Sequence, residues 1–236
     1  MIQKLLMLDG SPKVKPGNSN MLGVHLMEGL DSKLFETKQL RIVDFLRGKD
    51  QSEELVREVN DCDYMLLTFP LYVDCPPALV IKAMKIIDES RKAEKPEKDQ
   101  KMMAISNCGF PEPHQNESAL DTCRIFAEKT GFKWMGGIGV AGLTGVVSND
   151  GLKKDVAQAP LKSFGMKTKN FSKGLDTAAK AISQGEPLTS DGSHILLKQA
   201  LPPRMYCWVG KRMWRGYAKR NGALEKFNDR PFQQEA

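Results

Sequence analysis

Short apolar runs alternate with helix-like stretches along the first 140 residues. Apolar segments bounded by turn residues are typical of buried parallel strands, and we expect strands at residues 5–8, 34–42, 64–69, 102–106 and 134–140. Helices are expected between them, from Ser19 or Asn20 to Leu30, over residues 53–60, from Pro76 or Pro77 to residue 87, and over residues 117–130. This alternation predicts an α/β fold with a doubly wound, five-stranded parallel sheet.

The second half of the chain differs from the first in pattern and in charge. We expect a domain over residues 1–185 and a helical, basic, aromatic-rich extension over residues 186–236, packed on the domain or on a partner subunit. One helix is expected at 175–183, and another from Pro202 or Pro203 to Ala218. Nine basic and three acidic residues follow from Lys198 onward, which equals the net charge of +6 of the whole chain. The body is therefore neutral and the extension basic.

Composition excludes several classes of protein. The five cysteines are scattered and never spaced C-x-x-C, which disfavours a disulfide framework and a zinc or iron–sulfur site. No apolar run approaches the ~18 residues needed to span a bilayer. The N-terminus offers no signal-peptide cleavage pattern. We therefore expect a cytoplasmic protein without a metal centre.

The loop over residues 10–20 carries the first chemical signal. It follows the first expected strand and precedes a helix, whose N-terminus presents free N–H groups and a positive dipole end to an anion. The residues that could contact a phosphate are Ser11, Lys13, Ser19 and Asn20. The loop lacks the Gly-Lys-Ser/Thr of a Walker A motif. By itself it is explained equally well as a flexible turn before a capped helix.

The same loop resembles a known phosphate-binding segment. Leu8-Asp-Gly-Ser-Pro-Lys13, followed by Asn18-Ser19-Asn20, looks like the phosphate loop of the NAD(P)H-dependent FMN reductase family. Lys13 stands where that family commonly has arginine, and Met21 replaces a threonine, which removes one hydroxyl from the phosphate site. The resemblance implies a flavodoxin-like fold that binds FMN.

Two later loops extend the resemblance over residues 2–145. Residues 69–77 are similar to the family's Pro-x-Tyr stretch, which flanks the isoalloxazine ring, and residues 107–116 match the position of its other flavin-contacting loop. The resemblance assigns flavin contacts to Pro70, Leu71, Tyr72, Val73, Asn107, Cys108, Gly109 and Phe110. Ordinary packing is an alternative role for Tyr72. Whether Cys108 or His114 takes part in the chemistry stays open.

The resemblance also implies a function. It implies an oxidoreductase that takes hydride from NADH or NADPH onto FMN and passes electrons to a small-molecule acceptor, such as a quinone or a nitroaromatic compound. The flavin supplies the redox chemistry, so no catalytic acid–base residue is expected. Because flavin sites in this family are often completed by a neighbouring subunit, we expect a homodimer or larger homo-oligomer.

Two other functions remain in view. One is a non-enzymatic electron carrier of the flavodoxin type that docks to protein partners, although the neutral body and basic tail differ from the acidic docking surfaces of such carriers. The other is a regulatory module that has lost its flavin, against which Ser11, Ser19 and Asn20 speak.

Two further motifs are assigned to structure rather than to a ligand. Residues 137–142 spell G-x-G-x-x-G, but they lie late in the sheet and open no clear helix, so we interpret them as a glycine-rich strand end. Residues 205–217 combine four aromatic and three cationic residues. We interpret this segment first as a helix packed within the protein or its oligomer. Contact with a membrane surface is a second interpretation, and nucleic-acid binding is not expected.

Overall fold

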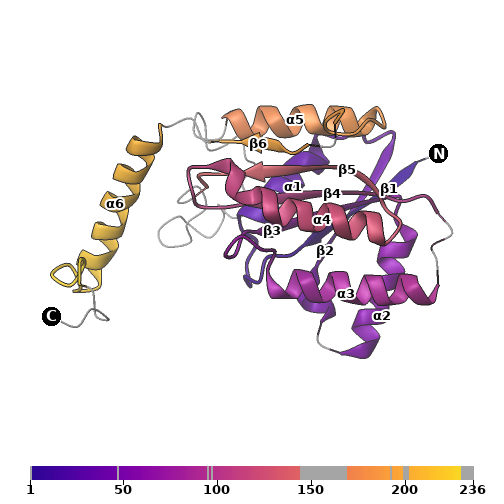
Figure 1. Cartoon of the computed structure of the whole chain (residues 1–236), viewed down its shortest axis with the longest axis horizontal. Coiled ribbons are helices and arrows are strands. Elements are labelled where there is room, and N and C mark those ends of the chain that lie inside the picture. Colours follow the sequence, from indigo (N-terminus) through magenta and orange to yellow (C-terminus); the bar gives the residue numbers. More distant parts are fainter. Residues whose placement is uncertain are drawn as a thin grey trace. The chain divides into compact units, whose positions relative to one another are not determined.

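A parallel β-sheet with six strands forms the centre of the computed structural model (Figure 1). The structure describes residues 2–46, 48–94, 96, 98–143, 169–191, 193–198 and 202–229. The strands are β1 (Gln3–Asp9), β2 (Phe35–Arg41), β3 (Tyr64–Pro70), β4 (Lys101–Asn107), β5 (Lys133–Val140) and β6 (Ile195–Leu197). Their order across the sheet is β2-β1-β3-β4-β5-β6, and every neighbouring pair is parallel.

Helices cover both faces of this sheet because its strands are apolar on both faces. On one face, α1 (Asn18–Glu28) and α5 (Lys169–Ser183) pack against Leu5 and Met7 of β1. On the other, α2 (Lys49–Asp61), α3 (Ala78–Ala93) and α4 (Glu117–Lys129) belong to the cluster around Leu6 and Leu8. Figure 1 places α5 and α3 on opposite sides of the sheet. Alternate residues of β1 thus enter two separate cores, as the two-residue repeat of a strand requires.

The observed sheet confirms the expected α/β fold but not the expected number of strands. The order β2-β1-β3-β4-β5 is that of flavodoxin-like folds. The prediction of five strands is wrong, because Ile195–Leu197 adds a sixth beside β5. These three residues lie in the part of the sequence that we assigned to the extension. So short a strand has no pattern of its own. Its pairing partner is β5, and the Ala141 N–H just after β5 donates to the Leu197 carbonyl at 2.9 Å.

The remaining elements connect or follow this sheet. Two short 3₁₀ helices, η1 (Ile42–Phe45) and η2 (Pro113–Asn116), follow β2 and precede α4. The chain divides into two compact units, Met1–Ala200 and Leu201–Ala236. The second unit contains α6 (Pro203–Arg220), which confirms the expected C-terminal helix. Within the described residues, no helix has both the length and the apolar character needed to cross a membrane.

Candidate functional site

Three loops meet at the carboxyl edge of the sheet, where the chain changes direction across it. After β1 the chain passes to β2 on one side, and after β2 it crosses to β3 on the other side of β1. In open α/β sheets, ligands bind outside the carboxyl ends of strands at such a switch point. The loops that follow β1, β3 and β4 are those that carry the predicted site residues.

These loops enclose a pocket of about 230 Å³. Nine of the twelve predicted site residues line it, namely Ser11, Lys13, Ser19, Pro70, Leu71, Tyr72, Asn107, Cys108 and Gly109. Asn18 and Leu143 complete the lining. Asn18 belongs to the phosphate-loop motif but was not named as a contact, and Leu143 was missed by sequence reasoning. The other three predicted residues lie elsewhere. Asn20 is buried in α1, whereas Val73 and Phe110 are 94% and 56% exposed. The structure therefore brings most, but not all, of the predicted residues together.

The loop after β1 begins with a close backbone contact at Gly10. Its N–H donates to the Thr68 carbonyl of β3 at 2.7 Å. A Cβ atom at this position would lie 2.3 Å from Cγ2 of Val80 and 3.1 Å from the Thr68 oxygen. Only glycine fits between these groups, and the chain can therefore turn tightly at the tip of β1.

Two side chains then fix the course of this loop. The carboxylate of Asp9 accepts the Ser11 N–H at 2.9 Å, and Nη2 of Arg41 donates to the Lys13 carbonyl at 2.7 Å. Burial raises the pKa of Asp9, while the Ser11 N–H and the Arg41 charge oppose that shift. Arg41 was missed by sequence reasoning. It ends the neighbouring strand β2, and only the parallel pairing of β1 with β2 places it opposite Asp9.

The N-terminus of α1 faces this loop without a side-chain cap. Gly17 precedes the helix, no side chain of the described chain caps the first turn, and that turn contains no acidic residue. The first N–H groups of a helix have no partner within it, and they lie at the positive end of its dipole. The arrangement suits an anion such as a phosphate group.

Asn107 links all three loops through hydrogen bonds. Its Nδ2 donates to Oγ of Ser19 at 2.7 Å and to the Phe69 carbonyl at 3.0 Å, and its own carbonyl accepts the Leu71 N–H at 2.8 Å. Because Ser19 Oγ accepts from Asn107, its hydroxyl hydrogen is directed elsewhere and can donate to a ligand in the pocket. Asn107 is therefore a positioning residue for the site.

A strained turn follows β3. Tyr72 and Cys75 exchange two backbone hydrogen bonds of 3.0 and 3.1 Å, and between them Val73 and Asp74 have φ values of 49° and 61°. Positive φ at both central positions describes a type I′ turn, which normally uses glycine or asparagine. A β-branched residue in this region is a genuine outlier, at a cost of roughly 1–3 kcal/mol. The turn holds Tyr72 at the pocket and projects Val73 into solvent.

The loop after β4 is supported from beneath by Asn116, another residue that sequence reasoning missed. The Asn116 side chain accepts from Oγ of Ser106 at 2.8 Å and donates to Sγ of Cys108 at 3.4 Å. Burial raises the pKa of Cys108, which is 6% exposed, so its thiol stays protonated near neutral pH. His114 is exposed on η2 and does not line the pocket.

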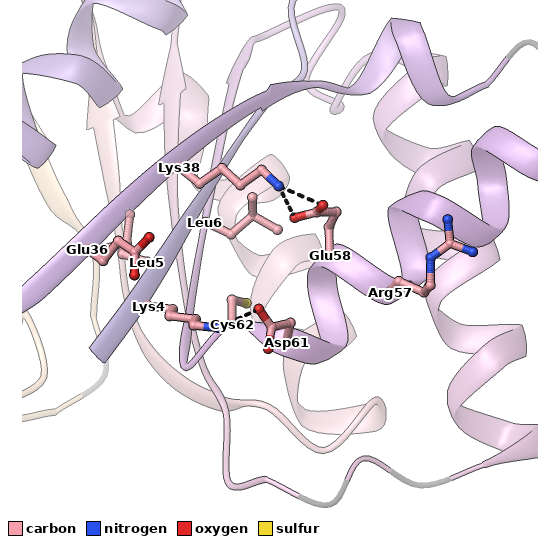
Figure 2. A pocket seen from close by; sticks show the side chains of 9 residues that line it. All are labelled: Lys4, Leu5, Leu6, Glu36, Lys38, Arg57, Glu58, Asp61 and Cys62. Carbon is pink, nitrogen blue, oxygen red and sulfur yellow. Dashed lines mark hydrogen bonds and ion pairs between the residues drawn. The ribbon is translucent and has the colours of Figure 1, made fainter. Parts of the chain in front are cut away.

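Two larger hollows lie at the opposite, amino-terminal edge of the sheet and differ from this pocket in chemistry. The first, of about 300 Å³, lies beside β2 and α2 (Figure 2). Its charges already pair: Nζ of Lys4 lies 2.8 Å from Asp61, and Nζ of Lys38 lies 2.6 Å from Glu58. Burial raises the pKa of the Cys62 thiol to about 12, so this thiol is inert. A second hollow of about 290 Å³ surrounds the ends of α3 and α4.

The glycine-rich segment at residues 137–142 has a packing role. A Cβ atom on Gly137 would lie 2.8 Å from Nδ1 of His194, and one on Gly139 would lie 2.9 Å from Leu196 and 3.0 Å from Asn116. The absence of side chains at these glycines therefore allows η2 and the chain around β6 to pack closely on β5. Across the residues that the structure describes, no group of three or more acidic, histidine or cysteine side chains could hold a metal ion.

Solved structures of several flavin enzymes share this fold. An FMN-dependent NADH-azoreductase from Bacillus anthracis, in complex with FMN, has a TM-score of 0.54 at 14% identity, covering 76% of this chain and 99% of that one. An NADH:FMN oxidoreductase in its apo form has a TM-score of 0.54 at 13% identity, covering 82% and 95%. An NAD(P)H:quinone oxidoreductase from Methanothermobacter marburgensis has a TM-score of 0.54 at 11% identity, covering 77% and 96%.

At these identities the likeness establishes the fold alone. No family model and no curated protein matches the sequence. The shared architecture gives the chain a flavodoxin-like fold, and the residues of its pocket indicate its chemistry.

Proposed function

We propose that this chain is an FMN-dependent NAD(P)H oxidoreductase that passes electrons to a quinone, a nitroaromatic compound or a similar small conjugated acceptor. One observation carries the proposal: nine residues that three separate loop motifs predicted as flavin contacts line a single pocket at the switch point of the sheet. The shared fold of the azoreductase, the flavin oxidoreductase and the quinone oxidoreductase supports it.

The inner end of the pocket fits the phosphate of FMN. Ser11 and Ser19 supply hydroxyl donors, Lys13 supplies a positive charge, and the uncapped N-terminus of α1 supplies backbone N–H groups. Asn107 orients the Ser19 hydroxyl through the 2.7 Å hydrogen bond. These groups would hold the phosphate without help from a side chain at position 21, where the related reductases have threonine.

The outer end of the pocket fits part of the isoalloxazine ring. Leu71, Tyr72 and Cys108 offer apolar surface, while Asn107 and Gly109 offer polar groups for the ring edge. At about 230 Å³ the pocket is smaller than the roughly 300–1,000 Å³ of sites that enclose a whole ligand. The ring would therefore extend past the pocket beside the exposed Tyr72 and Phe110, where a nicotinamide and an acceptor can reach it.

The chain's own residues bind and orient rather than react. When bound, FMN supplies the ring that accepts a hydride and returns electrons to an acceptor. The described pocket lining contains neither a carboxylate nor a histidine, so we assign no residue to proton transfer. The protonated Cys108 thiol contributes an uncharged wall instead.

An absorbance spectrum of the purified full chain, taken before and after addition of FMN and desalting, tests the cofactor. We expect a retained flavin band in an amount close to that of the chain. Stopped-flow mixing with NADH or NADPH then tests the activity: direct bleaching of the flavin followed by re-oxidation with a quinone is expected. Reduction only through a partner reductase would identify an electron carrier instead, and a chain that retains no FMN would refute the proposal.

Two further proposals accompany this function. Tyr72 in the pocket lining is exposed, and so are Val73 and Phe110, each next in sequence to a lining residue. These exposed side chains support a homodimer whose second subunit covers the ring. A monomer by light scattering at micromolar concentration would contradict the homodimer.

All five cysteines are free, which supports a location in the reducing cytoplasm.

A further inference from the structure

Helix α6 combines many positive charges with exposed aromatic rings. Over Pro203–Arg220 it carries six basic residues and no acidic one. None of its residues is buried, and Trp208 and Trp214 are 61% and 58% exposed. Two exposed indole rings on one helix are apolar surface that is available to a partner.

The two kinds of side chain separate into faces along the helix. At 100° per residue, Tyr206, Val209, Met213 and Tyr217 share one stripe, with Trp214 and Cys207 beside it. The opposite side carries most of the positive charge, in Arg204, Lys211, Arg212, Arg215 and Lys219, and the Trp208 ring lies among these cations. The helix is therefore amphipathic, with an aromatic face and a basic face.

Aromatic rings and cations also contact one another along the helix. The guanidinium of Arg212 lies 5.6 Å from the centre of the Trp208 ring, and that of Arg220 lies 4.6 Å from the Tyr217 ring. The rings of Trp214 and Tyr217 pack at 5.8 Å. Rings of this kind, with an apolar body and a polar edge, favour the headgroup level of a bilayer, where cations meet lipid phosphates.

The charge of α6 selects among the partners that could cover its aromatic face. A second copy of the same helix would bring six positive charges against six. A nucleic acid would satisfy the basic face but would leave the aliphatic part of the other face uncovered. A bilayer with anionic lipids satisfies both faces at once, because phosphates attract the cations and acyl chains receive the aromatic stripe.

We propose that α6 docks on the surface of bilayers that contain anionic lipids, lying in the plane of the interface with Tyr206, Met213 and Tyr217 toward the acyl chains. The docking surface is the helix itself. It does not require FMN to be bound, so its failure and the failure of the proposed function are distinguishable.

Flotation of the full chain with vesicles tests this proposal. The vesicles are phosphatidylcholine alone, or phosphatidylcholine with about one-quarter phosphatidylglycerol. We expect the chain to float only with the anionic vesicles, and to float less as salt rises. A blue shift of tryptophan emission on binding that is lost in Trp214→Ala but kept in Trp208→Ala would show that the ring beside the aromatic stripe enters the interface.

Two charge-reversal variants separate α6 from the rest of the molecule. Lys211→Glu/Lys219→Glu changes two cations other than the arginines that contact aromatic rings in the described helix. Each new carboxylate lies four residues from Arg215, which keeps the helix favourable. Vesicle affinity should fall at least roughly tenfold. The matched control Lys33→Glu/Lys173→Glu reverses two exposed lysines of the first unit and should change affinity by less than about twofold.

Three outcomes would overturn the proposal. They are the absence of flotation with anionic vesicles, equal loss of binding in both charge-reversal variants, and a dimer that dissociates in Trp208→Ala/Trp214→Ala while the wild type ignores vesicles. The last would identify a second copy of the chain as the partner of α6. Retention of FMN, measured in the same samples, reports separately on the pocket.

Discussion

The two edges of the sheet carry hollows of similar size with opposite chemistry. At the amino edge, about 300 Å³ is lined by lysines and acids that already pair with one another (Figure 2). At the carboxyl edge, about 230 Å³ is lined by serine hydroxyls, an asparagine and the uncapped start of α1. In parallel strand–helix units each helix begins near the carboxyl edge, so the positive dipole ends gather there. Volume therefore does not identify the site, whereas unused donors do.

The largest effect is expected from Gly10→Ala. The new Cβ would lie 2.3 Å from the stiff Val80 side chain and close to backbone at Thr68, so the tip of β1 must shift. We expect a loss of about 2–3 kcal/mol in the free energy of unfolding, together with weaker FMN binding. Chemical denaturation and FMN titration measure the two.

The control for this change is Gly17→Ala in the same loop. There the new Cβ meets only Cδ of Lys13 at 3.5 Å, an ordinary contact. Its cost should stay within about 1 kcal/mol. Equal destabilisation by the two variants would show that Gly10 is not constrained by its neighbours.

The next effect is expected from Ser19→Ala. The fold should survive, because Nδ2 of Asn107 keeps its bond to the Phe69 carbonyl. Loss of a charge-assisted hydrogen bond to the phosphate should weaken FMN binding by about 2 kcal/mol, or roughly thirtyfold. Lys38→Ala at the amino edge should leave FMN affinity unchanged. Fluorescence titration compares them, and a matching loss in both would mean that the phosphate has been placed wrongly.

A smaller effect is expected from Asp9→Asn. Burial raises the pKa of the Asp9 carboxyl above its ordinary value of 3.8. As pH rises from 3.8 through the raised pKa, the folded wild type must ionise a buried group, so its free energy of unfolding falls relative to that of the variant. At neutral pH Asp9→Asn should therefore be more stable, by about 1 kcal/mol, while its side-chain oxygen still accepts the Ser11 N–H.

The same substitution should tighten FMN binding, since it removes a negative charge near the phosphate. Thermal unfolding across acidic and neutral pH, with and without FMN, measures both effects. A variant that is less stable than the wild type at neutral pH would show that attraction to Arg41 outweighs the cost of burial.

The smallest effect is expected from breaking an ion pair at the amino edge. Lys38→Ala removes the 2.6 Å contact with Glu58, but the lysine side chain is largely in water. The free energy of unfolding should change by about 0.5 kcal/mol or less, and less still at high salt. A loss of free energy of unfolding as large as that expected for Gly10→Ala would contradict this prediction and show that the exposed ion pair stabilises the fold.

The sequence alone indicated most elements of the fold and most of the pocket. Apolar runs such as residues 64–69 predict buried strands, because a strand covered on both faces must be apolar throughout. The parallel topology then places the loops after β1, β3 and β4 at one edge. The turn residues of the first loop and the resemblance of all three loops to a flavin-binding family marked the site, and nine of the twelve predicted residues line the pocket. The sequence pattern did not show which side chains in these loops face the pocket, and three of the predicted residues, Asn20, Val73 and Phe110, do not line it.

Only the tertiary structure decided the rest. The three-residue strand β6 exists because β5 offers it hydrogen bonds, and α5 begins at Lys169, earlier than its apolar residues predicted. Arg41 and Asn116 support loops from other segments of the chain, and Leu143 reaches the pocket through a 3.2 Å bond with Asn18 across 125 residues. Such contacts depend on register and packing between distant segments, which a local sequence pattern does not encode.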